Sequence, residues 1–194
     1  MLDDYIRSKD INILCKYYFP HNKTAQNLTP KQIEIVRIIA YNEYPRVCIN
    51  AFTRYGKSQC VALGICLNII FHENKKWCII APQDDQTTII RNYIAELIID
   101  CPLLSNLLDI DRSFGVDRLK KEVSQKRMTF KNGCELRTIS AYQEAFRLMG
   151  FGVSGGVIID EAAKIEREAY AKIIRMLGDE PENSILIELA NPWS

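Results

Sequence analysis

The chain has 194 residues, of which 47% are apolar, so it can bury one good core and nothing in its length requires two domains. Its formal net charge of +1 excludes nucleic-acid binding through bulk charge, so any such contact must come from a local patch. The seven cysteines form no C-x-x-C pair and the two histidines are isolated, which argues against zinc and favours buried thiols in a reducing cytosol.

The N-terminal quarter of the chain is expected to be helical. Residues 3–19 alternate charged and apolar side chains and predict one or two short helices, and a polar connector follows at 20–29. Thr29 as N-cap and Pro30 at the first helical position then predict a helix that ends near residues 44–45. The N-terminus has no apolar signal core, and the longest apolar run, 60–71, is too short for a bilayer. We therefore expect a protein that is neither secreted nor membrane-bound.

The segment 51–58 reads Ala-Phe-Thr-Arg-Tyr-Gly-Lys-Ser, one residue away from the usual phosphate-loop pattern. An apolar strand at 47–51 leads into it and an apolar helix at 57–71 leads out, which is the order that the chemistry needs. Gly56 lets the backbone close around the phosphates, Lys57 bridges the β- and γ-phosphates, and the Ser58 hydroxyl ligates Mg²⁺. The alternative is a chance G-K-S at a strand–helix turn.

The central part of the chain continues the alternation of strands and helices. A strand is expected at 77–81, a capping turn at 82–86, a helix to about residue 100, and an irregular stretch over 101–116. Asn132-Gly133 between the apolar segments 123–130 and 135–139 predicts a β-hairpin.

A second half of a nucleotide site lies at residues 156–161. The apolar segment Gly156-Val-Ile-Ile predicts a buried strand that ends in Asp160 and Glu161, where α/β sheets place their sites. We expect Asp160 to hold Mg²⁺ through its water shell and Glu161 to orient and deprotonate the attacking water. Such an Asp-Glu pair alone often marks only a solvated helix start, and a helix is expected over 162–177, before a last strand at 184–190. The elements together predict an α/β fold, a mostly parallel sheet flanked by helices with an inserted β-hairpin.

These parts resemble, from about Leu28 to the end, the ATPase domain of the large terminase subunit, the DNA-packaging motor of tailed bacteriophages. The resemblance rests on motifs in a fixed order, namely 28–32 (Leu-Thr-Pro-Lys-Gln), the loop, 80–83 (Ile-Ala-Pro-Gln), 130–133 (Phe-Lys-Asn-Gly), 147–150 (Arg-Leu-Met-Gly), 157–162 (Val-Ile-Ile-Asp-Glu-Ala) and 189–192 (Leu-Ala-Asn-Pro). It implies a P-loop NTPase of the ASCE type over 28–194, with 1–27 as an N-terminal helical extension packed on the core.

The resemblance also implies roles for particular residues. Gln32 would read the adenine, although an exposed helix residue is an equally good interpretation. Arg54 would contact or sense the γ-phosphate, and Asn191 would couple hydrolysis to domain motion, although Asn-Pro is also a common turn. Arg147 would supply an arginine finger, in cis or to a neighbouring subunit, with an ordinary surface arginine as the alternative. With ATP bound, the remaining loop contacts would come from Thr53, Tyr55 and Gln59.

Two departures from the family pattern stand out. Ala51 replaces the first glycine of the loop, which costs little where the backbone angles suit alanine. The chain also stops at Ser194, whereas family members continue into a nuclease domain, so we expect ATPase chemistry without nuclease activity.

The partners implied by the resemblance are double-stranded DNA, a portal protein, a small terminase subunit and copies of the same chain in a ring, which can be monomeric in isolation. The expected place of work is the cytoplasm of an infected host cell. A basic segment could grip DNA phosphates, or it could be a solvated hairpin face. Its members are Arg118, Lys120, Lys121, Lys126, Arg127 and Lys131.

The leading hypothesis is a Mg-dependent ATPase motor domain that drives DNA into a procapsid. A helicase-like DNA-dependent ATPase is the alternative, although Ala162-Ala163 replaces the continuation of the Asp-Glu motif that such enzymes carry, and a second lobe is missing. A nucleotide-binding scaffold is the third, and Glu161 argues against it because a pure binder needs no water-activating carboxylate.

Overall fold

A six-stranded, mostly parallel sheet forms the centre of the molecule. The computed structural model describes residues 2–110, 120–121, 123, 125–141, 152–177 and 184–192. The strand order is β1-β6-β5-β2-β4-β3, in which neighbouring strands are parallel except β3, which is antiparallel to β4. The strands are β1 (Arg46–Asn50), β2 (Lys76–Ala81), β3 (Arg127–Thr129), β4 (Glu135–Ser140), β5 (Gly156–Ile159) and β6 (Ile185–Ala190). The predicted fold class, with its inserted hairpin, is therefore confirmed.

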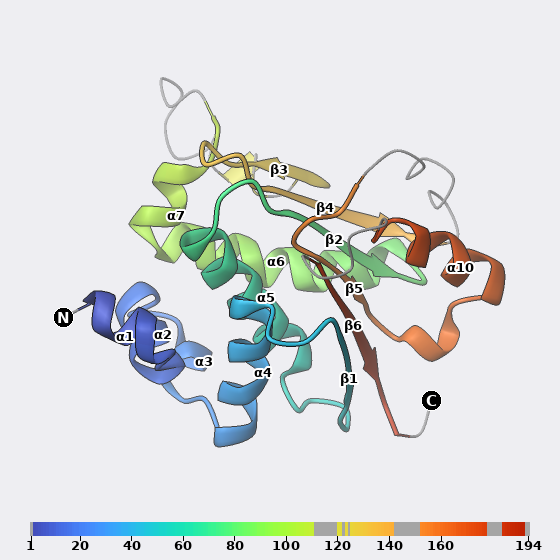
Figure 1. The fold of residues 1–194 in the computed structure, drawn as a ribbon, viewed down its shortest axis with the longest axis horizontal. Coiled ribbons are helices and arrows are strands. Elements are labelled where there is room, and N and C mark those ends of the chain that lie inside the picture. Colours follow the sequence, from blue (N-terminus) through green and yellow to red (C-terminus); the bar gives the residue numbers. More distant parts are fainter. Residues whose placement is uncertain are drawn as a thin grey trace.

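Helices connect the strands and cover both faces of the sheet (Figure 1). They are α1 (Leu2–Ser8), α2 (Ile11–Tyr18), α3 (Lys23–Gln26), α4 (Pro30–Tyr41), α5 (Lys57–Phe71), α6 (Asp84–Asp100), α7 (Pro102–Leu107) and α10 (Arg167–Arg175), with a 3₁₀ turn, η3 (Ala162–Lys164). The predicted start of α4 is confirmed, because Thr29 and Gln32 form a capping box ahead of Pro30. Among the described helices none is long and apolar enough to cross a membrane.

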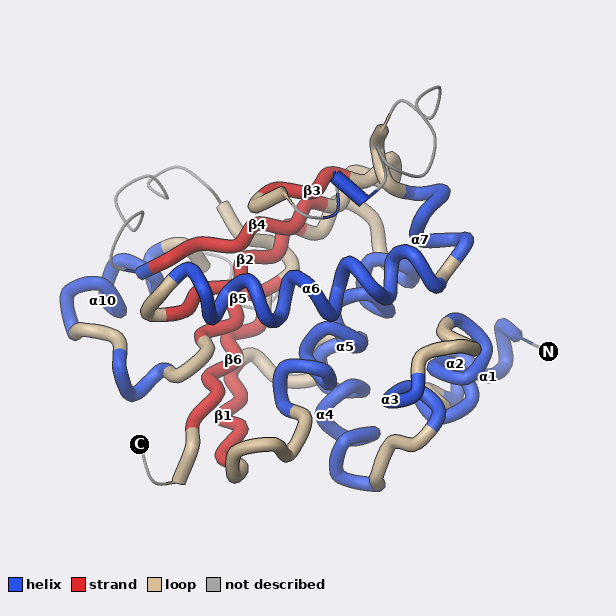
Figure 2. The backbone as a smooth tube through the Cα atoms, turned by 180° about the vertical axis from the view of Figure 1, so that it is seen from behind, coloured by secondary structure: helices blue, strands red, loops and turns tan. Residues whose placement is uncertain are grey.

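The alternation of side chains along the strands divides the core between the two faces of the sheet. On one face Ile79, Ile158 and Ile187 pack against α2 and α4–α7, in a cluster that also contains buried side chains of the segment before α4. On the other face Val157 and Ile159 pack against η3 and α10. Figure 2 shows α6 lying across the strands on the first of these faces. The result is three layers, with the sheet in the middle.

Two expectations about helices were wrong. The stretch 101–116 was expected to be irregular, but α7 forms at Pro102–Leu107 because Pro102, with its fixed φ, stands at the start of the helix. No continuous helix runs over 162–177, because Glu161 has a left-handed backbone (φ 49°) and only the η3 turn follows. The chain is extended again at Ile165, and α10 begins at Arg167.

Candidate active site

The carboxyl ends of β1, β5 and β6 bring the two predicted halves of the site together. Because these strands are parallel and in register, the segments that follow Asn50, Ile159 and Ala190 leave the sheet at the same edge. A pocket of about 490 Å³ opens there. Its lining includes ten predicted site residues: Thr53, Arg54, Tyr55, Gly56, Lys57, Ser58, Gln59, Asp160, Glu161 and Asn191.

The phosphate loop is a tight turn that ends in the first residue of α5. Arg54 (φ 68°) and Gly56 (φ 90°) both have left-handed backbone, and the Cys60 N–H donates to the Gly56 carbonyl, which closes the first turn of the helix. The Lys57 ammonium donates to the carbonyl of Ala51, to that of Phe52 at 3.3 Å and to Asn191 Oδ1 at 2.7 Å. A cation and the N-terminus of a 15-residue helix therefore face the same pocket, which suits a polyphosphate.

The two carboxylates after β5 have different surroundings. Asp160 Oδ1 accepts the Glu161 N–H at 3.0 Å. Glu161 Oε2 accepts from Gln86 Nε2 at 2.5 Å and from Lys164 Nζ at 2.8 Å. Two donors from different elements thus hold the Glu161 carboxylate in one orientation at the wall of the pocket.

These surroundings move the pKa values in opposite directions. The hydrogen bond from Lys164 is the main reason why the pKa of Glu161 lies below its ordinary value, with Gln86 acting in the same direction. Burial raises the pKa of Asp160, and the charge of Glu161 adds to that rise. Burial also lowers the pKa of Lys57, although the charges of Asp160 and Glu161 oppose that change. Glu161 is therefore ionised at neutral pH and able to accept a proton.

The residues at this edge fit a magnesium ion bound together with a nucleotide. Within the described ranges no group of three or more His, Cys, Asp or Glu could hold a metal by itself. Mg²⁺ in nucleotide sites takes few protein ligands and uses waters and substrate phosphates for the rest. The Ser58 hydroxyl and the half-buried Asp160 carboxylate, which line the same pocket, supply oxygen ligands of the right kind.

Two predicted site residues are not placed in this pocket. Gln32 lies behind the loop: it is not among the lining residues, and its amide nitrogen donates to the Tyr55 carbonyl at 2.9 Å. Arg147 lies outside the described residues, so the arginine-finger hypothesis stays a prediction.

Three lining residues on α6 were missed from the sequence, namely Gln86, Ile89 and Tyr93. They follow β2, which pairs with β5 in parallel, so the start of α6 lies beside Asp160 and Glu161. The signal that could have found them is the order of the strands, because helix residues after a neighbouring strand face the same edge of the sheet.

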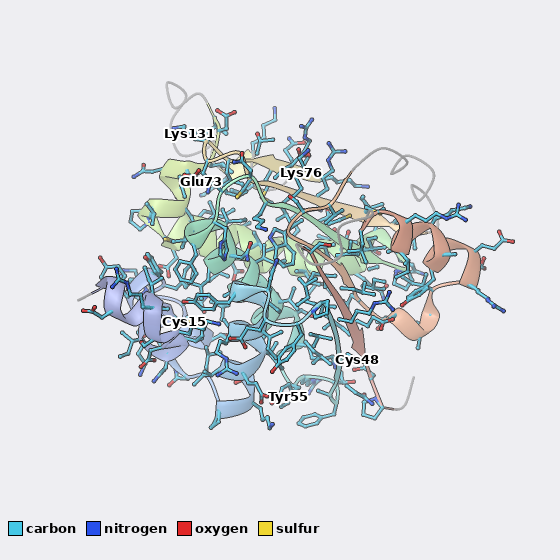
Figure 3. The ribbon with its side chains drawn as sticks, viewed as in Figure 1. Cys15, Cys48, Tyr55, Glu73, Lys76 and Lys131 are labelled. Carbon is cyan, nitrogen blue, oxygen red and sulfur yellow. The ribbon has the colours of Figure 1, made fainter. Side chains whose placement is uncertain are left out.

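The predicted basic segment does not form one patch. Lys126 pairs with Asp84 at the start of α6 (2.9 Å), and Arg127 pairs with Glu135 (2.8 Å). Lys131 lies at the β3–β4 turn, and Figure 3 shows it with Glu73 and Lys76 at the end of the molecule opposite Tyr55. Lys120 and Lys121 are exposed, and Arg118 lies outside the described ranges.

Solved structures with this fold include three from bacteriophages. The HK97 large terminase superposes with a TM-score of 0.70 at 18% identity over 94% of this chain and 37% of that one. The large terminase ATPase domain of Thermus phage P74-26 gives 0.58 at 20% identity, covering 82% of this chain and 68% of that one. The large terminase of a further thermophilic bacteriophage, in complex with ADP, gives 0.57 at 12% identity, over 86% and 39%.

These likenesses establish that the chain has the fold of large terminase ATPase domains. No protein-family model matches the sequence, and no curated protein sequence matches it. The chain spans well under half the length of the HK97 terminase and of the ADP-bound terminase that it resembles.

Proposed function

We propose that this chain is the ATP-hydrolysing motor domain of a viral terminase large subunit, which drives double-stranded DNA into a procapsid. One observation carries the proposal: the phosphate loop and the Asp160–Glu161 pair line a single pocket at the carboxyl edge of a parallel sheet. The shared fold with terminase ATPase domains, and with a large terminase solved with ADP, supports this assignment over other nucleotide-binding functions.

Each residue then has a defined task in hydrolysis. Lys57 and the loop amides bind the β- and γ-phosphates, and Ser58 and Asp160 hold Mg²⁺, which when bound neutralises charge on those phosphates. Glu161, held by Gln86 and Lys164, orients the attacking water and accepts its proton. Arg54 and Asn191 contact the γ-phosphate side of the pocket, and Arg147 completes the site from the same or a neighbouring subunit.

The partners in this proposal are double-stranded DNA, a portal protein, a small terminase subunit and further copies of the chain in a ring. The test is the steady-state ATPase rate per subunit, measured against protein concentration with and without linear duplex DNA. We expect the rate to rise with concentration and further with duplex, and to fall to background in Lys57→Ala and in Glu161→Gln. A flat, appreciable rate would favour the helicase-like alternative, and no turnover in any assembly state would favour a scaffold.

A mixing experiment tests the finger. Arg147→Ala should lose turnover and keep nucleotide binding, and activity should return when it is mixed with Glu161→Gln subunits, since each supplies what the other lacks. Absence of rescue would remove the trans assignment of Arg147.

A further inference from the structure

The side chain of Gln32 joins the start of α4 to the phosphate loop. Its Oε1 accepts from the Thr29 N–H at 2.9 Å and from the Thr29 hydroxyl at 3.0 Å, which completes the capping box. Its Nε2 donates to the Tyr55 carbonyl at 2.9 Å. Both polar groups of this amide are thus directed at the protein, although the residue was expected to read the adenine.

The bond to Tyr55 fixes the plane of the peptide that joins Tyr55 to Gly56. The C=O and N–H of one trans peptide point in opposite directions. Because the Tyr55 carbonyl points at Gln32, the Gly56 N–H points away from it. Gly56 lines the pocket and Gln32 does not, so this orientation turns the N–H to the side on which phosphates would bind.

Gly56 allows this peptide to adopt the opposite orientation as well. A rotation of the peptide plane changes φ of Gly56, which is now 90°, and glycine tolerates φ of either sign. The rotated peptide would present the Tyr55 carbonyl to the phosphates, which repels them. The approach is also close, since a Cβ at position 56 would lie 3.0 Å from Gln32 Nε2.

We propose that Gln32 is a positioning residue that selects the phosphate-binding orientation of the Tyr55–Gly56 peptide, and that it acts equally on nucleotides of any base. The inference rests on the proposed nucleotide site and deepens it. Gln32 then contributes to affinity for the triphosphate and not to the choice between adenine and guanine.

The test is isothermal titration of the whole chain, in the presence of Mg²⁺, with tripolyphosphate, ATPγS and GTPγS. Gln32→Met removes the donor to Tyr55, and we expect it to weaken all three ligands by the same factor, about tenfold, as for one hydrogen bond to a charged group. Thr29→Val is the matched control, because it damages the capping box and keeps the Gln32–Tyr55 bond, and we expect its affinities to stay within about twofold of wild type. Unfolding midpoints of both variants check that they are folded.

Other results would overturn the proposal. A loss confined to ATPγS would make Gln32 a reader of the base, and no loss for any ligand would leave it as a helix cap. Wild-type protein that binds none of the three would refute the nucleotide site itself, which separates that failure from the first two. The Gly56 amide resonance of ¹⁵N-labelled wild-type protein gives a readout without a variant. It should shift when tripolyphosphate is added, and an unmoved resonance would contradict the proposal.

Discussion

At the residue scale, the contact between Gln86 and Glu161 shows how the site orients its base. Gln86 comes from the first turn of α6 and reaches a carboxylate 75 residues further along the chain at 2.5 Å. A base must be held within hydrogen-bonding reach of the proton that it takes, so a partner that fixes its rotamer contributes to turnover without touching the nucleotide.

We predict that Gln86→Met lowers kcat about tenfold, a part of the 10²–10⁴ that a positioned base typically supplies, with KM for ATP unchanged. The measurement is steady-state ATPase kinetics, with Asn92→Ala, an exposed change on the same helix, as control. In a Glu161→Gln background the same Gln86→Met change should have no further effect, since the residue acts through the base. An equal loss in both backgrounds would mean that Gln86 acts by another route.

At the scale of elements, the β3–β4 hairpin is held by a buried carboxylate between two arginines. Glu135 accepts from Arg127 at 2.8 Å and also from Arg137. Burial by itself raises the pKa of Glu135, but the hydrogen bonds and charges of the two arginines outweigh it and hold the pKa below its ordinary value. A carboxyl group with a depressed folded pKa adds stability above its unfolded pKa, and this stability disappears as the pH falls through the folded pKa.

Glu135→Gln should therefore destabilise the protein at pH 7 by about 1–2 kcal/mol, because Arg127 is largely exposed and part of the charge interaction is screened. Urea unfolding measured from pH 7 downwards should show the difference from wild type shrinking below the ordinary Glu pKa and vanishing below the folded one. Glu96→Gln, an exposed carboxylate on α6, is the control. A difference that stays constant with pH would point to packing and not to charge.

The ion pairs of the hairpin also change how its basic residues should be tested against DNA. Reversing Lys126 or Arg127 would break contacts to Asp84 and Glu135, so a loss of binding could reflect local damage. Lys120 and Lys121 are exposed, and a change of each to glutamine removes the charge while keeping a polar side chain at the surface.

Lys120→Gln with Lys121→Gln should weaken binding to a linear duplex and reduce the slope of log K against log salt by up to about 1.8, or 0.9 for each DNA phosphate that is no longer neutralised. Lys16→Gln with Lys23→Gln, exposed on α2 and α3, makes the same change in net charge elsewhere. Equal effects of the two pairs would mean that duplex binding follows net charge and not this segment.

At the scale of the whole molecule, the sequence predicted the strands and the two halves of the site because each depends on local patterns. Apolar segments ending in Gly-Lys-Ser or Asp-Glu mark strands that leave the sheet at its carboxyl edge. The interruption after Glu161 was missed, because Ala162-Ala163 favours a helix and the left-handed backbone before it leaves no mark in the composition. The bonds of Gln32 and Gln86 were missed because they depend on which elements lie side by side.

The same dependence on tertiary contacts holds the helical layer to the sheet. Asn68 of α5 is fully buried, donates to the Ala40 carbonyl at the end of α4 and accepts from Trp77 Nε1 of β2, both at 2.9 Å. Asn42, which follows α4, donates to the Gly155 carbonyl just before β5, also at 2.9 Å. Two helices and the two central strands are thus joined through a few polar atoms that the sequence alone shows only as an asparagine inside an apolar helix.

Asn68→Ala should lower the free energy of unfolding by about 2–4 kcal/mol, since it leaves the Trp77 N–H and the Ala40 carbonyl buried without a partner and opens a cavity. Trp77→Phe should cost about 1–3 kcal/mol for the opposite half of the same bond and the lost ring volume. The double variant should be more stable than the sum of the two losses predicts, by about 1 kcal/mol, because the second change removes the group that the first left unpaired. Urea unfolding of the four proteins measures this coupling, with the exposed Asn106→Ala of α7 as control. Strict additivity would show that Asn68 stabilises the core by packing, and that its hydrogen bond to Trp77 does not connect α5 to the sheet.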